Sequence, residues 1–176
     1  MILSTDKISQ IADLLLTKKI GVLPTDTIYG IHCLAKDSDL FEKIIDIKGK
    51  DKNTPMITLI SDIKDLVNYD VNIDAFAQEQ INTFWPGPNT LIFETSTGET
   101  KSFRFPKNEF LIEVLNKTGP LISTSANLHG KPHSIDVTQA IEYFGDTIDF
   151  YVDGGVLNNA SSSIYKIIKG SVEKIR

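Results

Sequence analysis

Apolar residues follow two different spacings along this chain, and the two spacings predict where helices and strands lie. Apolar positions from Ile8 to Leu15 recur every three or four residues, as in a helix with one buried face, and Ser4 or Thr5 is the expected N-cap. The same spacing predicts further helices over 38–48, 62–66, 74–85, 110–115 and 137–144. The third of the long helices must stop at Pro86-Gly87-Pro88, because proline lacks the amide proton that would continue it.

Short apolar or alternating runs lie between these helical segments and predict strands. They cover 20–23, 31–35, 56–60, 90–94, 102–105, 121–123, 150–152, 163–168 and 172–175. Turn residues separate several of them: Pro24 ends the first run, Thr97 and Gly98 divide the fourth from the fifth, and Gly170 marks a hairpin between the last two.

The order of these elements predicts the fold class. Helices and strands are intermixed without the strict alternation of a parallel sheet, which favours an α/β fold with a twisted, mixed and largely antiparallel sheet against which the helices pack. The 176 residues contain no repeat, low-complexity tract or linker, so we expect one domain over residues 1–176.

Composition places the chain among ordinary globular proteins and suggests a location. Hydrophobic residues make up 41% and charged residues 23%, and no apolar stretch reaches the roughly 18 residues of a membrane span. Asp6 and Lys7 interrupt the place where a signal peptide would be apolar, and the one cysteine, Cys33, excludes an internal disulfide. We therefore expect a cytoplasmic protein without a membrane partner.

Charge narrows the possible partners. The net charge of -5 argues against a protein that coats nucleic acid by bulk positive charge, although a local basic groove stays open. Among 18 basic residues only Arg104 and Arg176 are arginine. Arginine offers a planar fork of donors that lysine lacks, so each of these two positions is either a chance occurrence or a recognition site.

Several common catalytic motifs are absent from the sequence. It contains no Walker A motif, no Gly-x-Gly-x-x-Gly, no Gly-x-Ser-x-Gly and no His-Glu-x-x-His. His129 and His133 are four residues apart, but the intervening glycine and proline favour a loop over a helical metal pair, and we expect no metal-ligating residues. Cys33 alternates within an apolar strand and is expected to be a core thiol.

Four polar groups remain, each beside the end of a predicted element, where loops can present side chains into a cleft. Pro24 to Gly30 could hold a small polar ligand or form a turn with side-chain bonds. Lys48 to Lys52 could bind phosphates or simply complement a helix end in water. Ser123 to Asn127 brings three hydroxyls and an amide to a strand terminus, a common ligand position. Arg104 faces away from its two phenylalanine neighbours, either to clamp a carboxylate or to meet solvent.

Together these groups resemble the YrdC family of threonylcarbamoyl-AMP synthases in their single-domain form. The resemblance runs from about Ile11 to the C-terminus. The matching stretches are Pro24-Thr25-Asp26-Thr27-Ile28-Tyr29-Gly30, Lys48-x-Lys50 followed by Pro55, Pro86-Gly87-Pro88 with Thr90, Arg104 before Pro106, and Ser123-Thr124-Ser125-Ala126-Asn127 with Gly130. It implies a YrdC/RibB-like fold and synthesis of threonylcarbamoyl-AMP and pyrophosphate from L-threonine, bicarbonate and ATP with Mg²⁺.

The resemblance also implies residue roles. The catalytic signature falls on Lys48, Lys50, Ser125 and Asn127, and ATP binding adds Thr54 and Arg176. The expected threonine-site residues are Thr25, Thr27, Tyr29, Arg104, Ser123 and Ser162, with Arg104 on the carboxylate. Lys50 stands where the family has arginine, so it keeps the charge but loses the bidentate fork.

The same resemblance implies partners downstream and leaves rival functions open. The adenylate would pass to a tRNA threonylcarbamoyl-transferase complex, with a weak contact to tRNA as a further expectation. An RNA-binding module or a catalytically divergent member of the family is the alternative, and the lysine at position 50 is what keeps the second open. ATP turnover that depends on threonine distinguishes them.

Overall fold

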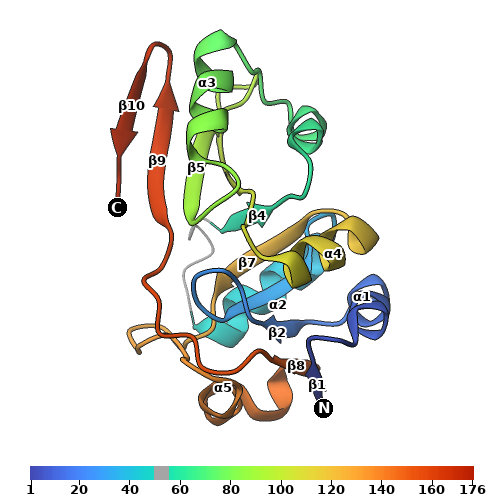
Figure 1. Ribbon diagram of the computed structural model, residues 1–176. Helices are drawn as coiled ribbons and strands as arrows, with labels where there is room; N and C mark the ends of the chain where they lie inside the picture. The colour runs from blue at the N-terminus through green and yellow to red at the C-terminus, as the bar shows by residue number, and fades with distance from the viewer. Residues whose placement is uncertain (50–55) are drawn as a thin grey trace.

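The computed structural model describes residues 1–49 and 56–176, and its ten strands form one mixed sheet. The strand order is β1-β8-β2-β3-β7-β4-β6-β5-β9-β10, with five antiparallel and four parallel neighbouring pairs (Figure 1). The α/β class and the mixed sheet are therefore confirmed, with antiparallel pairs in a narrow majority.

The elements agree closely with the periodicity. The strands are β1 (Ile2–Ser4), β2 (Gly21–Leu23), β3 (Gly30–Leu34), β4 (Ile57–Leu59), β5 (Asn89–Glu94), β6 (Thr100–Arg104), β7 (Leu121–Ser125), β8 (Phe150–Asp153), β9 (Ser163–Ile168) and β10 (Ser171–Lys174). The helices are α1 (Ile8–Leu16), α2 (Ser38–Lys48), α3 (Ala75–Phe84), α4 (Glu109–Thr118) and α5 (Val137–Phe144), with 3₁₀ turns η1 (Ile63–Tyr69) and η2 (Gly145–Thr147).

Acidic or amide side chains set where four of the helices begin. Asp37, Asp74, Asn108 and Asp136 each accept a hydrogen bond from a backbone N–H in the first turn of α2, α3, α4 and α5 respectively. These caps satisfy amides that have no partner inside the helix. Gly49 ends α2 in the left-handed conformation, which a residue without a Cβ adopts at little cost.

The two faces of the sheet are covered unequally. On one face α2 and α5 pack against β2, β3 and β7, and α3 with η1 packs against β5 and β6. On the opposite face α1 and α4 cover a cluster that contains Leu23, Leu121 and Phe150. The rest of this second face is not covered by a helix among the described residues, and the candidate site lies there.

Two predictions made from local spacing were wrong at their boundaries. Ser4 does not cap the first helix: it belongs to β1, and α1 begins at Ile8 without a side-chain cap. Among the described residues, strand β1 pairs only with β8, far along the chain, so no local pattern reveals it. Strand β7 extends two residues past the expected end, because Ser125 pairs with Gly30 of β3.

Within the described residues, every helix is too short or too polar to span a lipid bilayer. Cys33 is a buried free thiol, as its place in an apolar strand predicts, and burial raises its pKa to about 12.

Candidate functional site

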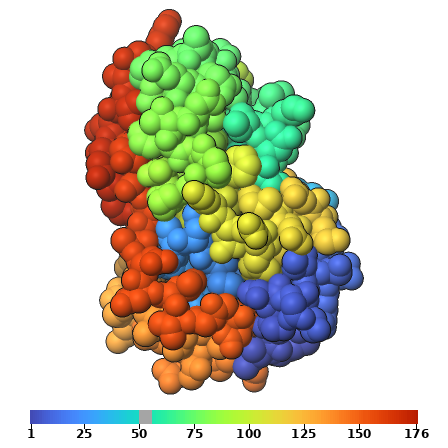
Figure 2. Space-filling model, viewed as in Figure 1, coloured from blue at the N-terminus to red at the C-terminus, as the bar shows by residue number. Residues whose placement is uncertain are grey.

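A cavity of about 540 Å³ opens on the uncovered part of the second sheet face. Nine of the predicted site residues line it: Thr25, Thr27, Tyr29, Arg104, Ser123, Ser125, Asn127, Ser162 and Arg176. They come from segments far apart in the sequence, and Figure 2 shows N-terminal, middle and C-terminal parts of the chain meeting on one face of the molecule. The sheet therefore brings three of the four polar groups together at the cavity, and of the fourth only Lys48 and Gly49 lie within the described residues.

Strand alternation decides which side chains reach the cavity. On β6, Phe103 points into the core on the helix-covered face, and Arg104 points to the opposite face, into the cavity. The same alternation places Ser123 of β7 on the cavity side, while Ile122, the residue before it, packs against the cluster on the other face. Ser125, two residues after Ser123, also lines the cavity. The expected orientation of Arg104 is confirmed.

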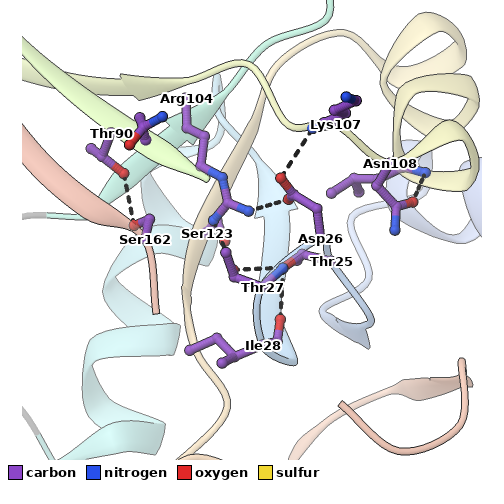
Figure 3. A network of polar contacts seen from close by, with 12 residues as sticks. Thr25, Asp26, Thr27, Ile28, Thr90, Arg104, Lys107, Asn108, Ser123 and Ser162 are labelled. Atoms are coloured by element: carbon purple, nitrogen blue, oxygen red, sulfur yellow. Dashed lines mark hydrogen bonds and ion pairs between the residues drawn. The ribbon is translucent and has the colours of Figure 1, made fainter. Parts of the chain in front are cut away.

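Arg104 is buried rather than exposed to solvent, and it forms an ion pair with a carboxylate of the protein itself, that of Asp26. Its Nη2 donates to Oδ1 of Asp26, and its Nη1 donates to Oγ1 of Thr27 at 2.9 Å (Figure 3). The second oxygen of Asp26 accepts the Lys107 backbone N–H at 3.0 Å. Nε–H of Arg104 has no hydrogen-bond partner among the described residues. Asp26 and Thr27 thus hold the guanidinium on one side, and it still has N–H groups that make no hydrogen bond within the described residues.

The turn between β2 and β3 is built from its own hydroxyls. Thr25 Oγ1 donates to the Ile28 carbonyl, accepts the Thr27 backbone N–H, and lies 3.0 Å from Thr27 Oγ1. Tyr29 donates its phenol proton to the Gly155 carbonyl and accepts the Gly154 N–H. The predicted turn with side-chain bonds is confirmed. Thr25, Thr27 and Tyr29 also line the cavity, and a ligand contact from them stays a prediction.

A buried lysine, Lys48, holds the backbone of the segment around the end of β7 by hydrogen bonds. Nζ of Lys48 donates to the Ser125 carbonyl, to the Asn127 carbonyl at 2.8 Å and to Asn127 Oδ1 at 3.1 Å. The Asn127 amide nitrogen in turn donates to the carbonyls of Leu128 and Lys131. The water-facing alternative for Lys48 is wrong, since only 1% of the residue is exposed. A phosphate contact from Lys48 stays a prediction.

Residues in and beside the C-terminal hairpin also line the cavity. The hydroxyls of Ser162 and Thr90 lie 3.0 Å apart, and both residues are buried. Arg176 donates through Nε and Nη2 to the Ser162 carbonyl, which keeps its side chain beside the cavity. The remaining predicted ATP residues, Lys50 and Thr54, lie outside the described residues, so their predicted roles remain predictions.

Sequence reasoning missed the pairing of Asp26 with Arg104, the buried His32 and the close approach of Gly30 to its ring. It also gave no site role to Lys131 and His133, which line the cavity. His32 is opposite Ser123 across the β3–β7 pair, and its Nε2 lies 3.2 Å from Ser123 Oγ. A histidine at an alternating position of an otherwise apolar strand was the available signal. A Cβ on Gly30 would lie 2.7 Å from the His32 ring and 3.2 Å from Ser123 Oγ, so only glycine fits there.

We expect Gly30→Ala to destabilise the protein by about 2 kcal/mol, because the added methyl overlaps a fully buried ring that cannot move away. Urea unfolding measures the change. His32→Ala removes the ring, so adding Gly30→Ala to that variant should cost much less than adding it to the natural protein. Equal costs in both backgrounds would rule out the steric explanation.

His32 also makes stability depend on pH. Burial, reinforced by the charge of Arg104 and opposed only by a contact with the Gly30 backbone, lowers its pKa from 6.5 to about 3. The folded protein therefore holds His32 neutral while the unfolded chain takes up a proton below pH 6.5, so stability falls as pH drops from about 6.5 towards 3.

We expect a loss of about 2 kcal/mol between pH 8 and pH 5, measured by urea unfolding. The lowered pKa values of Asp37 and Asp149 confine their contributions to lower pH, below their ordinary value of 3.8. His32→Gln should flatten the profile between pH 8 and 5, and an unchanged slope in that variant would assign the dependence to another group.

Comparison with known proteins places this site in a family. The family model described as "Telomere recombination", which groups Sua5, YciO and YrdC proteins, matches residues 13–176. The chain belongs to the Sua5/YciO/YrdC family. The predicted resemblance is thereby confirmed over nearly the whole sequence.

Named members of the Sua5/YciO/YrdC family are similar over most of this chain. The threonylcarbamoyl-AMP synthase of Bacillus subtilis is 32% identical, over 85% of this chain and 46% of its own length. That of Aliivibrio fischeri is 27% identical, over 80% of this chain and 82% of its own. The crystal structure of Pyrococcus abyssi Sua5 with L-threonine superposes with a TM-score of 0.90 at 25% identity, covering 100% of this chain and 57% of that one. The chain thus spans about half the length of the longer relatives.

Across residues 1–49 and 56–176 of this family member, no three histidine, cysteine or acidic side chains come together in a way that could hold a metal ion.

Proposed function

We propose that this protein is an L-threonylcarbamoyladenylate synthase. The observation that carries the proposal is the buried Arg104 guanidinium, which faces a cavity of about 540 Å³ lined by threonine and serine hydroxyls, in a chain that belongs to this family. The threonylcarbamoyl-AMP synthases among its relatives and the threonine-bound Sua5 structure supply the reaction and the amino acid.

The amino acid binds at the Arg104 end of the cavity. Asp26 and Thr27 hold the guanidinium on one side, so its orientation is fixed before a ligand arrives. The remaining N–H groups form the matching partner for the threonine carboxylate. Ser123 and Thr27 line the same end and are placed to contact the rest of the amino acid.

The reaction joins three substrates in two bond-forming steps. The threonine amine attacks the carbon of bicarbonate and water leaves, which gives a carbamate. A carbamate oxygen then attacks the α-phosphorus of ATP, the bond to the β-phosphate oxygen breaks, and pyrophosphate leaves. No covalent enzyme intermediate is needed, so the protein contributes orientation and charge neutralisation. A closed cavity would also protect the carbamate from water.

The phosphates bind at the opposite end, over the segment after β7. Ser125 and Asn127 line the cavity there, Lys48 holds their backbone from below, and Arg176 lies at the rim. Lys50 and Thr54 complete this group in the proposal. ATP arrives with Mg²⁺ bound to its own phosphates, because Mg²⁺ keeps most of its water ligands and prefers phosphate oxygens.

The product is a reactive mixed anhydride, which must be passed on. We propose that it serves threonylcarbamoyladenosine formation in tRNA through a downstream transferase complex, with at most a weak contact between tRNA and this protein. A cytoplasmic location fits that role.

Pyrophosphate release from ATP tests the function directly. The protein is incubated with ATP, Mg²⁺ and bicarbonate, with L-threonine, with L-serine, or with no amino acid. Release that requires threonine, together with mass-spectrometric detection of threonylcarbamoyl-AMP, supports the proposal. A folded protein that releases no pyrophosphate with any amino acid contradicts it and leaves the divergent or RNA-binding alternatives.

A further inference from the structure

His32 lies behind two residues of the cavity lining, Ser123 and Gly30. It is directly opposite Ser123 in the β3–β7 pair, fully buried, with Nε2 at 3.2 Å from Ser123 Oγ. Its other ring nitrogen, Nδ1, has no hydrogen-bond partner among the described residues. Ser123 itself lines the cavity together with Arg104.

The protonation state of the ring decides what Ser123 offers to a ligand. Burial lowers the pKa of His32, so the ring is neutral, with one N–H and one bare nitrogen. If Nδ1 carries the hydrogen, Ser123 must donate its proton to Nε2 and turns only lone pairs to the cavity. If Nε2 carries it, the ring donates to Ser123 Oγ, and the serine proton is free for a ligand.

The burial of Nδ1 favours the second arrangement. In the first, a buried N–H would have no acceptor, because the contact of the ring with the Gly30 backbone does not reach hydrogen-bond geometry at Nδ1. Such orphaned donors are rarer in proteins than unsatisfied acceptors. In the second, only a bare lone pair of Nδ1 is left. Gly30 lets the ring approach this closely, since a Cβ there would overlap it.

We propose that His32 is a positioning residue that holds its hydrogen on Nε2 and thereby fixes Ser123 as a hydrogen-bond donor to an anionic oxygen of the threonine-derived substrate. The proposal rests on the proposed function for the identity of that substrate. Arg104 and Ser123 then present donors on the same cavity, which suits the carboxylate of threonine or the carbamate formed on its nitrogen.

Nitrogen NMR of the ligand-free protein tests the tautomer without any activity. Long-range ¹H–¹⁵N correlations of ¹⁵N-labelled histidine distinguish a protonated Nε2 from a protonated Nδ1, and His32→Gln identifies the signal. We expect hydrogen on Nε2 and a bare Nδ1 at pH 7. Hydrogen on Nδ1 would overturn the proposal and leave the synthase function untouched.

A double-mutant cycle tests the effect on substrate. His32→Leu should raise the KM for threonine about tenfold while the KM for ATP changes less than twofold. The substitution removes the hydrogen bond that orients the Ser123 hydroxyl towards an anionic oxygen of the substrate. In the Ser123→Ala background the same substitution should have no further effect on threonine. His32→Gln, whose amide can still donate to Ser123, should recover most of the loss.

Cys33→Ala is the matched control, since Cys33 is the next residue, equally buried, and faces the other side of the sheet. It should lower stability without changing the KM for threonine. If His32→Leu changes both KM values equally, or acts equally with and without Ser123, His32 is only a packing residue. If the natural protein neither turns over nor binds threonine, the proposed function itself fails.

Discussion

Arg104→Ala is expected to lower kcat/KM for threonine by about 1,000-fold or more and to raise the threonine requirement far more than the ATP requirement. The guanidinium is the charged group that we assign to the threonine carboxylate, and charge-assisted contacts are the strongest hydrogen bonds in such sites. Steady-state pyrophosphate release at varied threonine and varied ATP measures the effect. Equal increases in both KM values would contradict the assignment of Arg104 to threonine.

The same substitution should also destabilise the protein, by about 3 kcal/mol in urea unfolding, because Asp26 is left as a buried carboxylate without its ion pair. Asp26→Asn in the Arg104→Ala background removes the stranded charge. This double variant should regain stability but stay inactive, which separates folding from binding. Lys107→Ala is the control, since its exposed side chain is lost but the backbone N–H bonded to Asp26 remains.

Lys48→Met is expected to lower stability by about 3 kcal/mol and pyrophosphate release by about 100-fold. Methionine has similar length but no donor, so the carbonyls of Ser125 and Asn127 lose the ammonium group that holds them. The segment that lines the proposed phosphate end would then be misplaced. Chemical unfolding and the KM for ATP measure the two effects.

A matched lysine on the same helix provides the control for that prediction. Lys43 is exposed on α2, and Lys43→Met should change neither stability nor the KM for ATP by a measurable amount. Asn127→Ala should reproduce part of the Lys48→Met phenotype, because it removes bonds of the same segment. A stable and fully active Lys48→Met protein would show that the lysine neither supports this segment nor contacts phosphate.

Spacing along the sequence predicted most elements because their cause is local. The helical periodicity over 137–144 and the proline triplet after 74–85 act within a few residues, and the structure places α5 and the end of α3 there. The alternation of Phe103 and Arg104 likewise fixed which face of the sheet each would occupy. Strand β1 was not predicted because the strand with which it pairs, β8, is distant in sequence.

The candidate site likewise combines features that local sequence predicts with contacts that it does not. Motifs along the chain, whose order resembles one family, were enough to predict which polar residues could form a site. The alternation around Phe103 was enough to predict that Arg104 faces away from that part of the core. Three contacts became visible only in the folded protein: Asp26 pairs with one side of that arginine, Lys48 is buried beneath the Ser125–Asn127 segment, and His32 lies behind Ser123. These contacts join residues on different strands and helices, and they depend on sheet register and burial, which no local spacing encodes.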